Sequence, residues 1–302
     1  MSLIVTHLDM SALTHFRDHS HHIFHGDVLQ SLSQLQDESI DLIFADPPYN
    51  IGKDFDGLVE NWGEEEFLSW CYEWIDECYR VLKPNGTFYL MNSTENMPFL
   101  DIWCRKNFFI RSRIIWSYDS SGVQAKKFYG SMYEPILMLV KDKNNYTFNA
   151  DEILVEAKTG AKRGLIDYRK NPPQPYNTVK VPGNVWEFSR VRFKMEEYEN
   201  HPTQKPEALL ERIIRASSNE GDTVLDPFSG SFTTCAVAKR LGRKSIGIEV
   251  NEEYVKMGIR RLELPSHYGE DELAKDKKRK TTNLSKKSRI QLDIENGESC
   301  II

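Results

Sequence analysis

The chain has 302 residues, of which 40% are hydrophobic and 28% charged, a composition typical of globular proteins. This length allows one large domain with a full core and an insertion. No apolar run approaches the roughly 20 residues of a membrane helix, and the first residues lack the basic and then apolar order of a signal peptide. We therefore expect a cytoplasmic protein without a membrane anchor.

The cysteines and histidines predict no metal site. Five cysteines are present without any Cys-x-x-Cys pair, so neither a disulfide framework nor a zinc site is indicated. His19, His21, His22 and His25 are close in sequence, but they connect a leader to a predicted strand. We expect them to be structural.

Charge is distributed unevenly along the chain. The net charge is −6, and residues 1–119 carry 8 Lys and Arg against 19 Asp and Glu. Residues 157–194 carry 9 basic residues against only Asp167 and Glu187. A basic segment on an acidic body is typical of a local surface that contacts phosphates.

The first 140 residues predict strands that alternate with helices. A leader without periodicity (1–20) precedes a short strand at 22–27, which ends in the carboxylate of Asp27. Residues 42–45 form an apolar strand that stops at Asp46-Pro47-Pro48-Tyr49, because prolines cannot donate to a β-ladder. A loop at 51–62 could close over a site. The clearest helix, 64–82, has three glutamates in its first turn and apolar residues at spacings of three and four.

Further elements follow in the same order. The strand at 87–91 completes a parallel βαβ unit with the preceding helix. Residues 96–107 predict another helix, and 110–118 and 133–140 predict two more strands. Residues 141–200 differ in character, because prolines, glycines, basic residues and aromatic residues alternate without periodicity. This segment is either a DNA-contacting insert or a solvated surface excursion.

The segment before the charged tail resembles a nucleotide-binding unit. A loop, His201-Pro202-Thr203-Gln204-Lys205-Pro206, leads into a helix, and a short strand at 223–226 ends in Asp226. After the turn Pro227-Phe228-Ser229-Gly230-Ser231, a helix at 232–241 and a strand at 245–249 end in Glu249, 23 positions after Asp226. A carboxylate about 20 residues on is typical of ribose binding. Because no Gly-x-Gly-x-x-Gly is present, we expect a ligand with adenosine but no diphosphate.

Beyond residue 264 the chain is strongly charged, which indicates either a solvated tail or a weak electrostatic clamp on DNA.

Asp46-Pro47-Pro48-Tyr49 suits chemistry on an exocyclic amine of a nucleobase. The lone pair of such a nitrogen is delocalised into the ring, so an enzyme must accept hydrogen bonds from its N–H groups to make it nucleophilic. The Asp46 carboxylate and the Pro47 carbonyl could accept them, held rigid by the two prolines. Tyr49 could stack on a base taken out of the duplex. Alternatively, the four residues form an ordinary surface turn.

Three stretches together resemble the DNA amino-methyltransferases of the β class. These are Asp46-Pro47-Pro48-Tyr49, the loop from His201 to Pro206, and Leu225-Asp226-Pro227-Phe228-Ser229-Gly230-Ser231. The resemblance covers about residues 22–265. Asn92-Ser93-Thr94-Glu95-Asn96-Met97-Pro98 and the insert are most similar to stand-alone enterobacterial adenine methyltransferases.

The resemblance implies a Rossmann-like α/β fold with a seven-stranded mixed sheet, helices on both faces and a circularly permuted order of motifs. A catalytic half (21–140) precedes a target-recognition insert (141–200), a cofactor half (201–265) and a charged tail (266–302). It implies S-adenosylmethionine as the methyl donor and double-stranded DNA as the partner, with a homodimer as the candidate assembly.

The resemblance also assigns roles to single residues. Asp46, Pro47 and Tyr49 would hold the target amine and base, with Pro48 shaping the turn. The cofactor would contact residues from both halves of the chain: Asp27 at the adenine amino group, Thr203 and Lys205 at the methionine end, Asp226, Phe228, Gly230 and Ser231 around it, and Glu249 at the ribose. The expected reaction is direct transfer to adenine N6 after base flipping, with ATGCAT as a candidate site.

Other functions stay open from the sequence. Asp at position 46 favours adenine N6, but cytosine N4 methylation is an alternative, and RNA or protein-glutamine methylation is a more distant one. A nicotinamide dehydrogenase would need the missing glycine triplet. A DNA-binding protein without catalysis would not need both Asp226 and Glu249.

Overall fold

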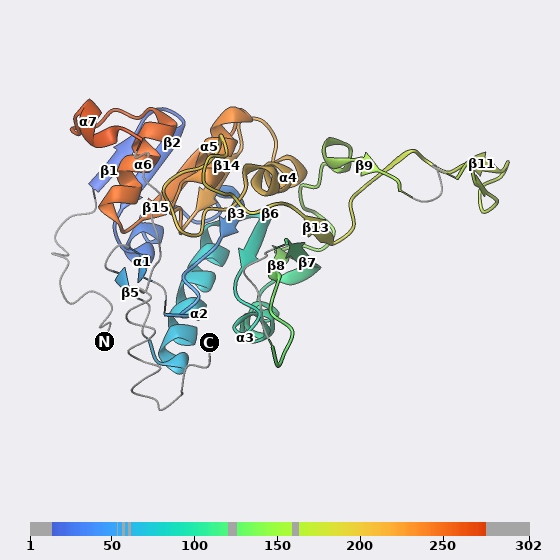
Figure 1. Cartoon of the computed structure of the whole chain (residues 1–302), viewed down its shortest axis with the longest axis horizontal. Coiled ribbons are helices and arrows are strands. Elements are labelled where there is room, and N and C mark those ends of the chain that lie inside the picture. The colour runs from blue at the N-terminus through green and yellow to red at the C-terminus, as the bar shows by residue number, and fades with distance from the viewer. Residues whose placement is uncertain are drawn as a thin grey trace.

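The computed structural model describes residues 14–52, 54–55, 58–59, 62–119, 126–158 and 163–275. Its centre is one mixed sheet with helices on both faces (Figure 1). Among the described residues, no helix is both long and apolar enough to cross a membrane.

The main sheet has nine strands where we expected seven. Their order is β1-β2-β15-β14-β3-β6-β8-β7-β13. The extra strands are the short ones at the two edges, β1 and β13, which lie outside the segments that predicted strands. The bounds are β1 Thr14–Arg17, β2 His21–His25, β3 Ile40–Ala45, β6 Leu82–Met91, β7 Phe109–Ser117, β8 Tyr133–Val140, β13 Val185–Glu187, β14 Thr223–Asp226 and β15 Lys244–Glu249.

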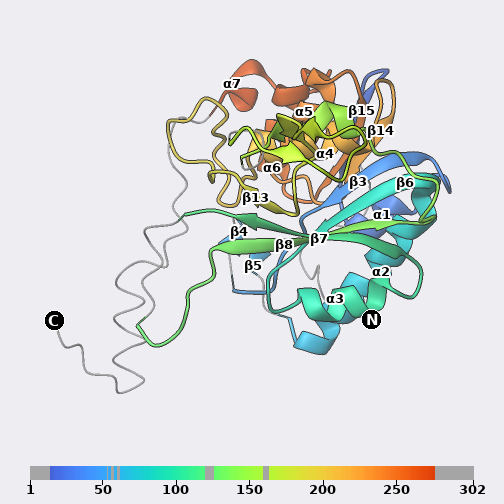
Figure 2. The ribbon, with the colours of Figure 1, turned by 90° about the vertical axis from the view of Figure 1, so that its right-hand side faces the viewer.

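The strands run in one direction from β2 to β6. β15 is parallel to β2 and to β14, and β3 is parallel to β14 and to β6. β8 is antiparallel to both β6 and β7, which makes the sheet mixed. Figure 2 shows the twist of β7 and β8 against the parallel part.

Helices cover both faces because the central strands carry apolar residues on both sides. On β3, Ile43 and Ala45 face one core, whereas Leu42 and Phe44 face the other. The first face holds α1 (Val28–Leu32), α2 (Glu64–Val81) and α3 (Met97–Cys104). The second holds α4 (Glu207–Ser217), α5 (Thr233–Arg240) and α6 (Glu252–Leu262). A three-layer α/β/α arrangement results.

The predicted leader is partly wrong, because part of it is a strand. Thr14–Arg17 forms β1, which pairs antiparallel with β2, and His15 stacks on Phe24 with 4.2 Å between ring centroids. His21 Nδ1 lies 2.9 Å from Ser245 Oγ. Four of the cysteines, at 71, 78, 104 and 235, are free and buried, while Cys300 is outside the described residues.

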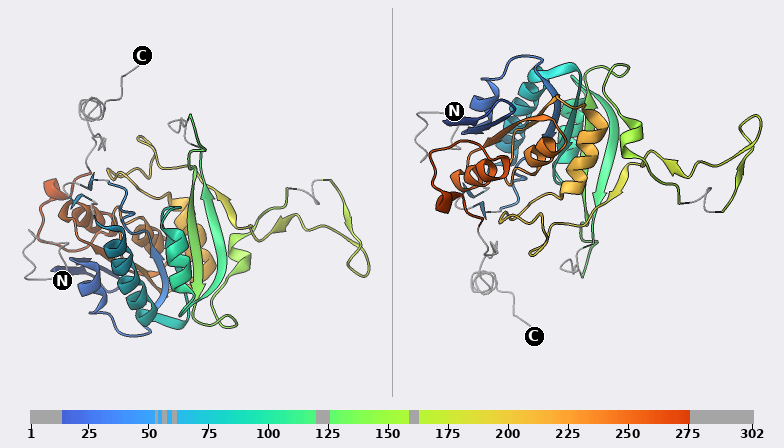
Figure 3. Two further views of the ribbon diagram at one scale, coloured as in Figure 1. Left: turned by 90° about the horizontal axis from the view of Figure 1, so that it is seen from below. Right: turned by 90° about the horizontal axis from the view of Figure 1, so that it is seen from above.

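Part of the segment between β8 and α4, from β9 (Val155–Glu156) to β12 (Val179–Lys180), forms an extended arm. After the 3₁₀ helix η1 (Ala150–Ile153), short two-stranded pairs join β9 to β12 and β10 (Ile166–Asp167) to β11 (Gln174–Pro175). Figure 3 shows this arm reaching away from the body, and β13 then returns the chain to the main sheet. A smaller pair, β4 (Asp54–Phe55) and β5 (Leu58–Val59), lies in the predicted loop before α2.

The charged tail begins with ordered structure. α7 (Glu270–Leu273) follows α6, and Tyr268 OH donates to Glu252 Oε1 at 3.3 Å. Residues 276–302, which carry most of the basic tail residues, lie outside the described part of the chain.

Phe232 fixes the turn between β14 and α5. Its φ is +57°, a left-handed value uncommon for a bulky residue, and its side chain is fully buried. The ring fills a notch beside two glycines, because a Cβ on Gly247 or Gly258 would come within 2.6 Å of it. Because Gly247 on β15 and Gly258 on α6 have no side chains, the Phe232 ring fits between them and holds the turn in place.

We predict that Gly247→Ala lowers the free energy of unfolding by about 1–3 kcal/mol, because the added methyl overpacks the notch. Gly183→Ala is the control, since a Cβ there meets no atom within 4 Å. Urea unfolding of both variants measures the difference. Equal stabilities for the two variants would contradict the packing argument.

Candidate active site

The two motif strands lie next to each other in the sheet. β3 and β14 are parallel, with Leu42 opposite Val224 and Ile43 opposite Leu225. The carboxyl ends of both strands therefore lie side by side along one border of the sheet, which runs across the strand ends. We call this border the carboxyl edge, and it is where open α/β sheets bind ligands. Asp46 is near enough to Asp226 to be one of the charges that raise the pKa of Asp226.

Asp46 is held by two donors. Tyr49 OH donates to Oδ1 at 2.6 Å, and Lys205 Nζ donates to Oδ2 at 2.5 Å. Burial raises the pKa of Asp46, although the Lys205 ammonium acts in the opposite direction. Burial alone would lower the pKa of Lys205, but Asp46 and Glu134 outweigh it and the pKa is raised. The structure thus places Lys205 against the Asp46 carboxylate, and its predicted role at the methionine end stays a prediction.

The turn after Asp46 is fixed by two asparagines. Asn96 Nδ2 donates to the Tyr49 carbonyl at 2.8 Å. Asn50 has a left-handed φ of +56°, and its side-chain amide forms two hydrogen bonds with the backbone of Trp62, at 2.9 and 3.1 Å. Neither asparagine was among the predicted site residues, although the stretch from Asn92 to Pro98 contributed to the resemblance.

Glu134 is a third residue that the sequence analysis missed. It is the second residue of β8, and its Oε2 lies 3.0 Å from Tyr49 OH and 3.5 Å from Lys205 Nζ. Burial, followed by the charges of Asp46 and Glu134, raises the pKa of Tyr49 well above its usual value. Tyr49 is therefore a neutral hydrogen-bond donor.

The second part of the site is formed by the end of β15. Glu249 Oε2 accepts from Gly230 N at 2.8 Å, and Oε1 accepts from the backbone N–H groups of Val250 and Asn251 at 3.0 and 2.8 Å. Asp27 follows the neighbouring strand, β2, where its Oδ1 caps α1 by accepting from Leu29 N and Gln30 N. Both carboxylates thus stand at the carboxyl edge of the sheet.

Gly230 allows a close approach at the turn after β14. Its φ is +47°, and a Cβ at this position would come within 2.8 Å of His201 Nε2. The loop that contains Thr203 and Lys205 therefore packs directly on the glycine turn. Phe228 lies beside this turn and meets Trp70 and Trp74 edge to face.

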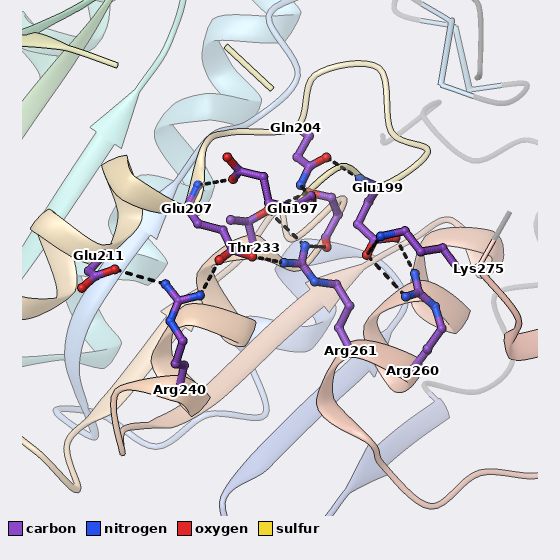
Figure 4. A network of polar contacts seen from close by, with 11 residues as sticks. Glu197, Glu199, Gln204, Glu207, Glu211, Thr233, Arg240, Arg260, Arg261 and Lys275 are labelled. Atoms are coloured by element: carbon purple, nitrogen blue, oxygen red, sulfur yellow. Dashed lines mark hydrogen bonds and ion pairs between the residues drawn. The ribbon is translucent and has the colours of Figure 1, made fainter. Parts of the chain in front are cut away.

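A polar network fixes this loop to α4 and α6 (Figure 4). Gln204 accepts from Glu199 N at 2.7 Å and donates to the Glu197 carbonyl at 2.6 Å. Arg261, which is 8% exposed, donates to the Ser231 carbonyl at 2.7 Å and to Glu207 at 2.9 Å. Arg261 is another missed residue, because nothing in the sequence of α6 sets it apart from its neighbour Arg260.

The carboxyl groups of Asp226 and Glu249 both have raised pKa values. Burial raises the pKa of Asp226 to about 7, with hydrogen bonds from Thr234 and Phe228 N acting in the opposite direction. Burial likewise raises the pKa of Glu249 to about 7. Acids with shifted pKa values gathered at a strand edge are typical of a functional site.

The described residues contain no group of three or more His, Cys, Asp and Glu side chains that could hold a metal ion. The site instead combines paired carboxylates, one buried lysine and a close-approach glycine turn. A three-layer fold with these motifs at adjacent strand ends belongs to the class of open α/β proteins that bind a ligand at the carboxyl ends of their strands.

Comparison with known proteins identifies the family. The sequence model of the DNA methylase family matches residues 40–260, and the chain belongs to this family. DNA adenine methyltransferase YhdJ of Escherichia coli (strain K12) is 70% identical over 277 residues, which cover 92% of this chain and 94% of that protein.

Solved structures show the same fold. The M1.HpyAVI–SAM complex superposes with a TM-score of 0.56 at 26% identity, covering 80% of this chain and 98% of that one. The cytosine-N4-specific PvuII DNA methyltransferase has a TM-score of 0.63 at 21% identity, covering 92% and 94%. At that identity, the second likeness concerns the fold alone.

The raised pKa of Asp226 predicts a pH-dependent stability. From about pH 4, where the unfolded carboxyl ionises, to about pH 7, the folded protein keeps a proton that the unfolded chain has lost. The free energy of unfolding therefore falls as pH rises through this window. We expect Asp226→Asn to remove this loss, up to about 4 kcal/mol at pH 8.

Urea unfolding at pH 5 and pH 8 measures this difference. Asp142→Asn is the control, since Asp142 follows β8 at the opposite edge of the sheet and is exposed. An Asp226→Asn variant that loses as much stability as the wild type between these two pH values would refute the prediction.

Proposed function

We propose that this protein is an S-adenosylmethionine-dependent DNA methyltransferase that modifies adenine N6. The observation that carries the proposal is the adjacency of Asp46, at the end of β3, to the Asp226 and Glu249 unit at the ends of β14 and β15. The 70% identity to a DNA adenine methyltransferase supports it, as does the cofactor named for the M1.HpyAVI complex.

The residues of the second half fit this cofactor. Glu249 has a carboxylate oriented by three backbone donors, which suits ribose hydroxyls. Gly230, whose φ is +47°, gives the turn after β14 a backbone conformation that L side chains rarely adopt, and it has no side chain of its own between the backbone and a ligand. We assign Asp226, Phe228 and Ser231 to its surroundings, Asp27 to the adenine amino group and Thr203 to the methionine end. When bound, the cofactor supplies an electrophilic methyl group.

The residues of the first half fit the target amine. Asp46 and the Pro47 carbonyl accept hydrogen bonds from the amine, and Pro48 fixes the direction of the turn. Tyr49, held through its hydroxyl and its carbonyl, offers a ring face to a flipped base. Burial keeps the Asp46 carboxylate a stronger base than an exposed one, which suits it to take the proton that the amine loses.

Cytosine N4, also an exocyclic amine of a nucleobase, is the alternative target. Asp46 favours adenine, and so does the relative at 70% identity.

The palindrome ATGCAT is our candidate recognition site. Sequencing of modified bases in DNA from cells that overproduce the protein would test it. The permuted order of the two halves and the expected homodimer also stay proposals, the latter testable by light scattering.

We further propose that the arm within residues 141–200 contacts DNA. Its exposed residues include Arg163, Lys170 and Lys180, and exposed aromatic side chains such as Tyr168 lie among them. This combination suits phosphates and bases better than it suits a solvated surface excursion.

We predict that Asp46→Asn lowers the methylation rate on DNA by about 10²–10⁴-fold, because the amide no longer accepts the proton or polarises the amine. Binding of S-adenosylmethionine, measured by calorimetry, should stay within about twofold, since Asp46 belongs to the other half of the site. Asp142→Asn serves as the control. Full activity of Asp46→Asn would overturn the proposed function.

Removing arm charges should change the salt dependence of DNA binding. We expect the triple variant Arg163→Ala, Lys170→Ala, Lys180→Ala to weaken binding and to reduce the slope of log K against log salt by about 2–3. Lys143→Ala, exposed at the opposite edge of the sheet, should leave the slope unchanged. An unchanged slope in the triple variant would argue for a surface excursion without DNA contact.

A further inference from the structure

Two donors occupy Asp46, the residue that must receive the target amine. Tyr49 OH and Lys205 Nζ each take one oxygen of its carboxylate, at 2.6 and 2.5 Å. A carboxylate engaged in this way is a poorer acceptor for an incoming N–H group. The amine therefore gains most from Asp46 if at least one of these donors can move to another acceptor.

Glu134 provides that acceptor for both donors. Its Oε2 lies 3.0 Å from Tyr49 OH and 3.5 Å from Lys205 Nζ. Tyr49 has one hydroxyl proton, so it can donate to only one of the two carboxylates at a time. Lys205 has three donor hydrogens and is 9% exposed, so water cannot easily replace a carboxylate beside it.

Glu134 is itself fixed in position. Tyr118 OH donates to its Oε1 at 3.3 Å from the end of β7, and the side chain of Glu134 is 17% exposed. The Arg190 guanidinium lies 5.1 Å from the centre of the Tyr118 ring, which links this carboxylate to the segment between β13 and α4. Glu134 thus lies between the turn from Asp46 to Tyr49 on one side and Tyr118, which follows β7, on the other.

We propose that Glu134 is a positioning residue that takes over Lys205 and Tyr49 when the target amine reaches Asp46. This inference rests on the proposed function and adds a residue to the same site. Two buried carboxylates share one buried ammonium, so the lysine can pass from one to the other without leaving a buried cation unpaired. Asp46 is then free to accept the amine hydrogen bond.

The exchange also affects the basicity of Asp46. Several ionisable groups face this pair: Tyr49 after β3, Tyr118 at the end of β7, Lys205 before α4, Asp226 at the end of β14, and Arg190. Among the causes that act on Asp46, burial and the Glu134 charge raise its pKa, whereas Lys205 lowers it. Removing the Glu134 charge should therefore lower the pKa of Asp46.

The test compares Glu134→Gln with the wild type in single-turnover methylation of duplex DNA between pH 5 and pH 9. Glutamine keeps the size and an acceptor for Tyr118, but it cannot balance the ammonium. We expect the rate to fall by about 10²-fold and the acid limb of the pH profile to move to lower pH. Calorimetric affinity for S-adenosylmethionine should stay within about twofold of the wild type.

Two further variants separate positioning from structure. Tyr118→Phe removes the hydrogen bond from Tyr118 to Glu134 and keeps the ring, and we expect about a tenfold loss of rate. Glu152→Gln, on η1 at the opposite edge of the sheet and 58% exposed, is the control and should match the wild type.

Each outcome bears on one claim. A Glu134→Gln rate equal to that of the wild type would overturn the inference while leaving the proposed function intact. A lower rate with an unmoved acid limb would also overturn it, because a structural defect alone predicts that result. A wild-type protein that transfers no methyl group to DNA in the same assay would instead sink the proposed function.

Discussion

The parallel pairing of β3 with β14 is the interaction on which the site depends. It joins residues near position 43 to residues near position 225 and thereby aligns two strand ends from distant parts of the chain. Both strands are buried on two faces, so a shift in register would move apolar residues out of two cores at once. The same packing that stabilises the sheet therefore sets the distance between Asp46 and Asp226.

Burial gives this edge of the sheet its chemistry. Asp46, Asp226 and Glu249 all have raised pKa values because each lies away from water at a strand end. A single lysine, Lys205, supplies the compensating charge beside Asp46, and backbone N–H groups orient the carboxylate of Glu249. The site is thus acceptor-rich, as a donor amine and ribose hydroxyls require.

Elements with strong local signals were predicted well. The helix expected at residues 64–82 is α2, Glu64–Val81, because its apolar spacing and acidic first turn act within the helix. β1 was missed, because Thr14–Arg17 is a strand only through its pairing with β2. Glu134 was missed because one glutamate at the start of an apolar strand has no pattern around it. Arg261 was missed because its importance comes from the buried carbonyl of Ser231, which is distant in sequence.

The sequence by itself determined the order of the elements and the two strand-end motifs, since these follow from hydrophobic periodicity and from residue types at fixed spacing. The resemblance of those motifs to known enzymes indicated the family. Tertiary structure decided which side chains share a proton or a charge. The family resemblance and its positive charge assigned Lys205 to the methionine end, and the structure places its ammonium on Asp46, where two carboxylates are buried together. The reason is that electrostatic partners are selected by distance and burial across strands, and neither quantity is encoded in local sequence.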